Sequence, residues 1–434
     1  MKFVAIKHED MTAEIKIREP VRSAIAVEEK WKGRKDVRPL KPKQIPKYNP
    51  SIVLLKKNKD FCTYIMAYRA SYPTKGPKKR MTKPRLPPYN WTLWDTQWAT
   101  QFDGVGFCKL KIFNSGKTTI KNEFIPARET SGIMDARLVK WKDGLYLIYN
   151  RYAWQQPHPN SNTELEKCAN LYCITMFMRP VKVFKDRIKL TGPPRLLCRD
   201  KHQQFEKNWS LVVPFKRKRL LHYSFLPHKF LSSGMTRDPN ADRCEFISPA
   251  RSDFFMKLHK YYKYLFFEPE ANPVAVTTPL VEFDSKHYIG VGRIKVSFLD
   301  FKMSRRDKIT KCARELGKRL GLKGVNPKEW WRNDYVHPGS LLYFQFFYTV
   351  KKGSLELGNF SACMLPQCKD VPYFSTVTFP VAIQPFTRGK FAISTGISDI
   401  DCGIMIATRK ELRDMMIYNN NSKPSSYDFI IKDF

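Results

Sequence analysis

A hairpin-like unit recurs five times along this 434-residue chain and limits the folds that it can adopt. Each copy starts at a corner of small residues or proline, continues in a short run rich in Val, Ile or Leu, turns through charged residues, and returns in a second apolar run with aromatic side chains. Two strand-length apolar runs around a short turn are typical of a β-hairpin. Matched on the valine at the end of each first run, the copies fall at Val53, Val139, Val212, Val281 and Val381.

The spacing of the copies indicates one repetitive domain. The gaps are 86, 73, 69 and 100 residues, and a small sheet repeated at such intervals is typical of a β-propeller. The sequence therefore predicts an all-β fold, a five-bladed β-propeller over residues 48–415, with a pair of β-sandwiches as the alternative. Residues 1–47 are polar, Pro-rich and basic and predict an extended N-terminal arm, and residues 416–434 predict a C-terminal tail.

The longest gap has a candidate cause in an insert over about residues 297–335. Within it, residues 304–323 have the pattern of a basic amphipathic helix, because apolar residues recur at helical spacing between Ile309 and Leu320. We expect this helical insert to interrupt blade four.

The charge of the chain is strongly unbalanced. It has 77 Lys and Arg against 40 Asp and Glu, a formal net charge of +37, and 42% of its residues are hydrophobic. That hydrophobic content suffices for a large core, so a disordered polycation is excluded. No membrane span or secretion signal is evident, so we expect a cytoplasmic location. The charge makes nucleic acid or an anionic surface a candidate partner of the basic arm.

Several motifs resemble parts of metal or cofactor sites, but the residues around them do not complete such sites. The ten cysteines include no CxxC pair and the eight histidines no HExxH pair, so we expect no metal site and reduced, buried thiols. The sequence NSGKT at Asn114 resembles the end of a phosphate-binding loop, but Lys111 stands where that loop needs glycine, so we expect a hairpin turn. Gly104-Val105-Gly106 and Gly290-Val291-Gly292 lack the third glycine of a dinucleotide site. We therefore expect no cofactor.

The corners of the five copies carry polar residues at equivalent positions. In a propeller such positions converge on the mouth of the central channel, where ligands bind. Small polar residues also cap strands and turns, and we favour that role for Asn49 and Thr277. We favour a functional role for Asp135 with Arg137 and for Lys207 with Asn208, because a carboxylate and a lysine at strand starts are poor choices for packing.

The corner motifs also resemble those of a known family. In chain order they read NPSI with AYR, DARLV with GLYLIYN, EKNWS with LHYS and a following PH, TTPLV with YIGVG, and STGISDID. Over residues 48–415 they resemble the five-bladed propellers of mannoside phosphorylases and β-1,2-mannosyltransferases, especially the glycosidase- or glycosyltransferase-like proteins of large DNA viruses, protists and fungi. The resemblance implies a glycosyltransferase or phosphorylase that acts on mannose-like sugars.

The resemblance implies a role for each matching residue. Asp135 would be the general acid that protonates the glycosidic oxygen, while phosphate attacks the anomeric carbon from the opposite face. Cationic residues would hold the phosphate or a sugar-phosphate or sugar-nucleotide substrate. The expected substrate- and phosphate-binding residues are Arg69, Arg137, Lys207, Asn208, His228, Thr278 and Asp399.

Departures from the family pattern leave the activity open. The fourth corner lacks the family's Arg and paired Gly before Thr278-Pro279, and Arg293 stands where the family has a histidine. The alternative is therefore a catalytically degenerate propeller that binds glycan, nucleic acid, or a virion or protein partner through its basic surface. The stretch at 259–267, where aromatic residues and cations alternate, fits nucleic acid, although an ordinary strand explains it better.

Overall fold

The computed structural model describes 23 strands in five sheets, and it describes the chain over the following ranges. They are 1–7, 10–11, 47–73, 100–130, 132–141, 144–154, 172–197, 210–215, 218–226, 228–233, 244–248, 254–255, 274–297, 341–364, 366, 378–397, 401–420 and 422.

The first two sheets come from the first two predicted copies. The first sheet has the order β2-β3-β4-β5, with strands β2 (Lys47–Lys57), β3 (Phe61–Pro73), β4 (Thr100–Phe113) and β5 (Thr118–Phe124). The second has the order β6-β7-β8-β10, and β9 also pairs with β8; its strands are β6 (Ile133–Trp141), β7 (Gly144–Trp154), β8 (Tyr172–Val183), β9 (Ile188–Leu190) and β10 (Arg195–Leu196).

The other three sheets follow in chain order. The third consists of β11 (Ser210–Phe215), β12 (Lys218–Phe225), β13 (His228–Ser233) and β14 (Cys244–Ile247). The fourth consists of β15 (Val274–Val276), β16 (Val281–Glu282), β17 (His287–Ser297), β18 (Leu341–Lys351), β19 (Leu357–Phe360) and β23 (Tyr418–Asn419). The fifth consists of β20 (Thr378–Pro385), β21 (Lys390–Ile397), β22 (Asp401–Thr408) and β1 (Lys2–Ile6).

Helices are few and short in the described ranges. They are α3 (Ala127–Thr130), α9 (Arg409–Asp414) and the 3-10 turn η4 (Thr387–Gly389). No helix of the described residues is long and apolar enough to cross a membrane. The predicted helix at 304–323 and the aromatic stretch at 259–267 lie outside the described residues.

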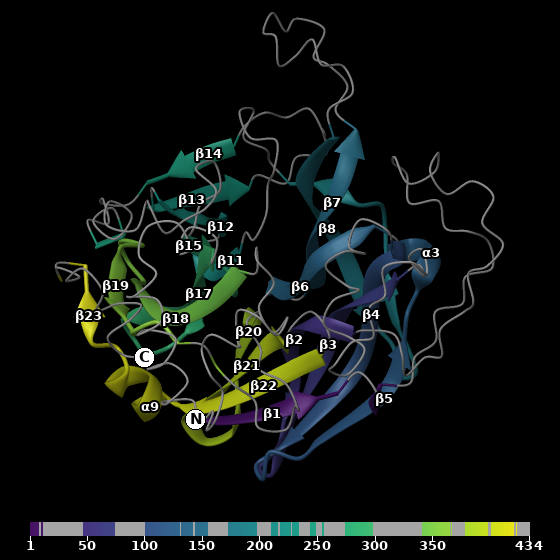
Figure 1. Cartoon of the computed structure of the whole chain (residues 1–434), viewed down its shortest axis with the longest axis horizontal. Helices are drawn as coiled ribbons and strands as arrows, with labels where there is room; N and C mark the ends of the chain where they lie inside the picture. Colours follow the sequence, from purple (N-terminus) through teal and green to yellow (C-terminus); the bar gives the residue numbers. More distant parts are fainter. Residues whose placement is uncertain are drawn as a thin grey trace, which may run out of the picture.

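The sheets form a ring, which gives the all-β fold a propeller-like arrangement (Figure 1). Each sheet contacts the next in chain order, and the fifth contacts the first through β20 and β2. The inner strands β2, β6, β11 and β20 lie nearest the common centre (Figure 1). All five predicted hairpins are confirmed, as β2/β3, β6/β7, β11/β12, β16/β17 and β20/β21.

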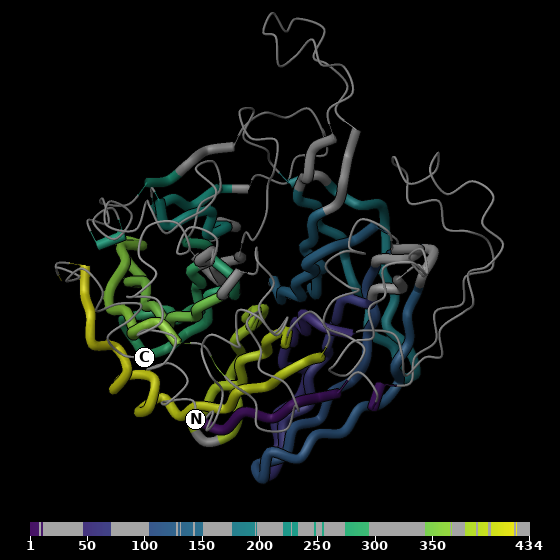
Figure 2. Tube along the Cα trace, in the orientation of Figure 1, coloured from purple at the N-terminus to yellow at the C-terminus, as the bar shows by residue number. Residues whose placement is uncertain are grey.

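The N-terminal segment differs from the predicted arm at its start. Residues Lys2–Ile6 form β1, which pairs antiparallel with β22, so the first strand of the chain lies at the outer edge of the last sheet (Figure 2). The strand has only five residues, and its partner is about 400 residues away in the sequence, so no local pattern indicates the pairing. The end of the predicted arm is also structured, since Lys47 begins β2 and is fully buried.

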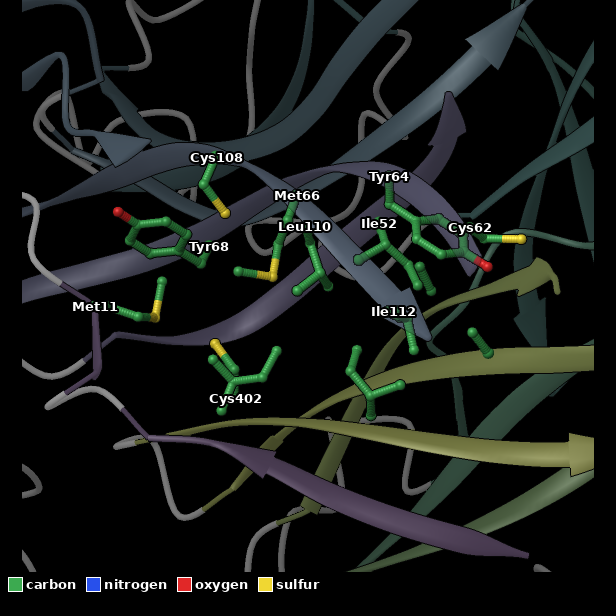
Figure 3. Packing of buried hydrophobic residues seen from close by; sticks show 14 of the residues in the cluster. Met11, Ile52, Cys62, Tyr64, Met66, Tyr68, Cys108, Leu110, Ile112 and Cys402 are labelled. Carbon is green, nitrogen blue, oxygen red and sulfur yellow. The ribbon is translucent and has the colours of Figure 1, made fainter. Parts of the chain in front are cut away.

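Buried side chains fill the seams between neighbouring sheets. Figure 3 shows the seam between the first and fifth sheets, where Met66 and Leu110 face Cys402. The seam between the third and fourth sheets is aromatic, and there the ring of Phe225 lies 4.8 Å from that of Tyr348. Cys62, Cys108, Cys363 and Cys402 are buried thiols, which confirms the prediction for these four cysteines.

The glycines of the GVG motif at Gly290 have a packing role. Gly292 lies opposite Phe346 in the β17/β18 pair, and a Cβ atom at Gly292 would lie 2.4 Å from the Phe346 ring. The glycine therefore makes room for an aromatic ring.

The NSGK segment is the predicted hairpin turn, closed by the bond from the Gly116 amide to the Phe113 carbonyl at 2.8 Å.

Candidate functional site

Two of the predicted corners share an unusual backbone conformation. Asn49 in β2 and Asp135 in β6 have positive φ angles of 50° and 46°, and the strand register shifts at both corners, between Tyr48 and Ser51 and between Met134 and Arg137. Asn and Asp tolerate this left-handed conformation better than other residues with a side chain. A bulge redirects the side chains around it, so the repeat places comparable residues at the same end of two neighbouring sheets.

Asp135 forms an ion pair across the seam between the first and second sheets. Its Oδ1 atom lies 3.4 Å from Nη1 of Arg69, and the two side chains keep 18% and 13% of their surface exposed. The guanidinium of Arg69 also lies over the Tyr48 ring, 5.5 Å from its centroid. The structure thus brings together two of the predicted site residues, and solvent can reach both.

Arg137 crosses the centre of the ring. It belongs to β6 of the second sheet, and its Nε atom donates a hydrogen bond of 2.7 Å to the carbonyl oxygen of Thr277, in the fourth sheet. Its guanidinium also lies 5.8 Å from the ring of Phe379, in the fifth sheet. The side chain is almost fully buried. Burial lowers the pKa of Arg137 to about 10, with Asp135 opposing and Arg293 adding to the shift.

Arg293 supplies a further cation beside Arg137. Its guanidinium lies between two aromatic rings, 4.6 Å from Tyr343 and 4.9 Å from Phe379. The Nε atom is buried and has no hydrogen-bond partner among the described residues. The sequence identified Arg293 only as a departure from the family pattern. The signal that could have revealed Arg293 is its position in the repeat, at the end of the fourth sheet that corresponds to the corners of the other sheets.

These four side chains form one charged group, which we call the axial cluster: Arg69, Asp135, Arg137 and Arg293. It holds three guanidinium groups and one carboxylate, so an anion would complement its charge. Guanidinium groups match phosphate and carboxylate geometry, and a single carboxylate can act as a general acid or base. The cluster can therefore bind an anionic group and transfer one proton.

Thr278 has a structural position. It is fully buried, and its Oγ1 atom accepts a hydrogen bond of 2.8 Å from the amide of Val291. The amides of Thr277 and Thr278 donate to the Val291 carbonyl at 3.3 and 3.2 Å. The hydroxyl of Thr278 thus stabilises the corner of the fourth sheet. This contact explains why a threonine is buried at this position, with no need for a bound ligand.

His228 lies in an apolar environment in the third sheet. It is 3% exposed, and its ring lies 5.0 Å from that of His222 and 5.0 Å from that of Phe230. Burial lowers the pKa of His228 to about 3, so the ring is neutral at pH 7. Neither ring nitrogen has a hydrogen-bond partner among the described residues. A neutral imidazole brings no charge to a phosphate, so the predicted cationic role of His228 finds no support in its surroundings.

Three other predicted site residues, Lys207, Asn208 and Asp399, lie outside the described residues. In the described ranges no group of three His, Cys, Asp or Glu side chains could hold a metal ion.

Comparisons with known proteins give only distant similarities. No family model matches the chain, and no curated protein matches it. Among solved structures, the chain is similar to a glycosyl hydrolase from Bacteroides ovatus, with 10% identity, 84% of this chain and 85% of that chain covered, and a TM-score of 0.44.

Two further solved structures are similar to the same degree. A β-1,2-mannobiose phosphorylase from Listeria innocua has 9% identity, covers 86% of this chain and 92% of its own, and has a TM-score of 0.44. A GDP-Man-dependent mannosyltransferase from Leishmania mexicana has 10% identity, covers 87% and 91%, and has a TM-score of 0.41. All three are carbohydrate-active enzymes at low identity. The case for a function of this chain therefore rests on its own residues.

Proposed function

We propose that this chain is a carbohydrate-active enzyme, a glycosyltransferase or phosphorylase, that acts on mannose-like sugars at the channel mouth of a five-bladed propeller. Each of the five sheets would be one blade, and the order of contacts around the ring supports that count. The observation that carries the proposal is the partly exposed Asp135 carboxylate, which pairs with Arg69 and interacts with Arg137, itself a neighbour of Arg293.

The proposed chemistry needs one acid and several cations. Asp135 would donate a proton to the glycosidic oxygen as the bond to the anomeric carbon breaks, and phosphate would attack that carbon from the opposite face. An incoming phosphate dianion needs cations beside it rather than a second carboxylate. Within the axial cluster, Arg69 and Arg293 are the cations with exposed surface, and they could bind this phosphate.

The other predicted site residues take different parts in the proposal. Arg137 and Thr278 would support the site from buried positions, through their bonds to the Thr277 carbonyl and the Val291 amide. Lys207, Asn208 and Asp399 remain predicted binding residues. The cytoplasmic location remains a prediction from the sequence.

Titration calorimetry with mannose 1-phosphate tests the proposed site. Replacing Arg293 with Met should weaken binding at least about tenfold, because a hydrogen bond to a charged group contributes about 1.5–3 kcal/mol. Arg413→Met is the matched control, since Arg413 is an exposed arginine whose guanidinium lies 6.0 Å from the Phe283 ring. Uncharged mannose should lose little affinity in either variant. Equal losses for mannose and mannose 1-phosphate would contradict an anion site at Arg293.

A catalytically degenerate propeller is the second candidate, and two observations favour it. Arg137 is buried and its Nε atom already donates to the Thr277 carbonyl of the same chain, and His228 is neutral at pH 7. Such a protein would bind a glycan or a protein partner without turnover. Binding of mannosides that survives the change Asp135→Asn, with no product formed by the unmodified chain, would identify this function.

A further inference from the structure

A basic surface lies along the outer edges of the first and second sheets, away from the axial cluster. Within residues 117–124 and 181–190, six exposed side chains are cations and one, Asp186, is acidic. None of the six makes an ion pair with a described residue. We call this surface the basic edge; it consists of Lys117, Lys121, Lys182, Lys185, Arg187 and Lys189.

Side-chain hydrogen bonds join the two parts of the basic edge. Nζ of Lys109, in the first sheet, donates to the carbonyls of Phe184 and Lys185 at 3.1 and 2.8 Å. Nδ2 of Asn122 donates to the same Lys185 carbonyl at 2.8 Å. The β8/β9 turn is therefore fixed against β5, and the cations of both sheets form one surface.

Lysines oppose one another directly in both sheets. Lys109 is the register partner of Lys121, and Lys182 is the register partner of Lys189. Like charges directly opposite destabilise a sheet. A bound polyanion would remove this repulsion.

An exposed aromatic ring lies within the same surface. Phe184 is 40% exposed, and the Arg187 guanidinium lies 5.4 Å from its ring centroid. Lysines alone are also used to protect sheet edges from aggregation, but an exposed phenylalanine works against that purpose. Exposed aromatic rings among cations are the elements with which proteins bind single-stranded nucleic acid, through base stacking and phosphate contacts.

We propose that the basic edge binds single-stranded nucleic acid. Its distance from the axial cluster follows from the register: Lys182 follows Val181, which pairs with Leu145, and Leu145 pairs with Lys140 near the end of β6. Asp135 is near the start of β6. The two sites thus lie at opposite ends of the second sheet, and nucleic acid leaves the sugar site open.

Fluorescence anisotropy with a labelled 20-nucleotide dT strand tests this proposal. Replacing Lys182, Lys185, Arg187 and Lys189 with Gln should weaken binding at least tenfold. It should also make the negative slope of log affinity against log salt shallower by about 3, because each of the four lost phosphate contacts contributes about 0.7. The matched control replaces four exposed cations of other sheets and α9, Lys286, Lys351, Arg409 and Lys410, with Gln. The control should keep both affinity and slope. An equal loss in both variants would show that total charge, not this surface, binds the strand.

The change Phe184→Ala separates nucleic acid from other polyanions. It should weaken dT binding at least about fivefold through the lost stacking, and leave binding of inorganic polyphosphate unchanged, because polyphosphate has no bases. This variant keeps every cation, so its result does not depend on the folding of the fourfold variant. Unchanged dT affinity in Phe184→Ala, or no dT binding by the unmodified chain at 0.15 M salt, would overturn the proposal.

Discussion

The Nε atom of Arg137 lies 2.7 Å from the carbonyl oxygen of Thr277, and this hydrogen bond joins two sheets that are not neighbours in the ring. The guanidinium of the same residue also lies 5.8 Å from the ring of Phe379, in the fifth sheet. The buried side chain of Arg137 thus connects the second and fourth sheets across the ring.

The change Arg137→Ala should lower the free energy of unfolding by about 3 kcal/mol, because it leaves a cavity and a buried carbonyl without its donor. Urea denaturation measures the loss. The exposed Arg187→Ala variant is the control and should change stability by less than about 0.5 kcal/mol. An Arg137→Ala protein as stable as this control would show that the bond across the ring contributes nothing.

The buried histidines should make the protein less stable in mild acid. Burial lowers the pKa of His228 from its usual 6.5 to about 3, and burial together with His228 lowers that of His222. Between these values the unfolded chain binds more protons than the folded one, so stability falls as the pH drops below 6.5. The slope is about 1.4 kcal/mol per pH unit for each histidine.

Urea denaturation from pH 7 to pH 4.5 checks this slope. The change His228→Gln should flatten it by about 1.4 kcal/mol per pH unit. The change His287→Gln is the control, because His287 is only half-buried and pairs with Asp284 at 3.0 Å. A slope that His228→Gln leaves unchanged would mean that His228 does not stay neutral in the folded protein.

Gly396 should tolerate no side chain while Asn49 is present. A Cβ atom there would lie 2.0 Å from the Oδ1 atom of Asn49, so Gly396→Ala should cost about 2 kcal/mol in unfolding free energy. Adding Asn49→Gly removes the clash, and the pair should show a coupling of at least about 1 kcal/mol. Gly353→Ala, where a Cβ atom meets nothing within 4 Å, is the control. Additive effects of the two changes would contradict the contact.

Glu123 should stabilise the buried Lys47. Nζ of Lys47 lies 3.8 Å from Glu123, and the hydroxyl of Tyr68 donates to Glu123 at 2.8 Å. Burial lowers the pKa of Lys47 and Glu123 opposes that shift. The change Glu123→Gln leaves a buried charge uncompensated and should cost about 3 kcal/mol, measured by denaturation. Adding Lys47→Met should recover at least half of the loss; a double variant less stable than Glu123→Gln would refute the pairing.

The repetitive part of the fold is predictable from the sequence because it follows local patterns. Alternating apolar runs and charged turns locate all five hairpins, and the corner pattern brings Arg69 and Asp135 together. The pairing of β1 with β22 has no such local signal, since five residues carry too little pattern to indicate a partner at the other end of the chain.

The state of individual site residues depends on packing that the sequence does not reveal. His228 follows a proline at the predicted corner, but the surrounding rings remove its charge. Thr278 occupies a corner position, but its hydroxyl is used by the Val291 amide. Arg293 becomes a candidate only when the fold places its guanidinium between Tyr343 and Phe379.

The central claim is that Asp135 acts as the acid or base of a mannoside-active enzyme. Its most direct test is the turnover of β-1,2-mannobiose with phosphate, and of GDP-mannose with a mannose acceptor, by the unmodified chain and by Asp135→Asn at equal folded concentration. The account predicts turnover by the unmodified chain in one of the two assays and a loss of at least about 100-fold in the variant. Undiminished turnover by Asp135→Asn, or none by the unmodified chain in either assay, would contradict it.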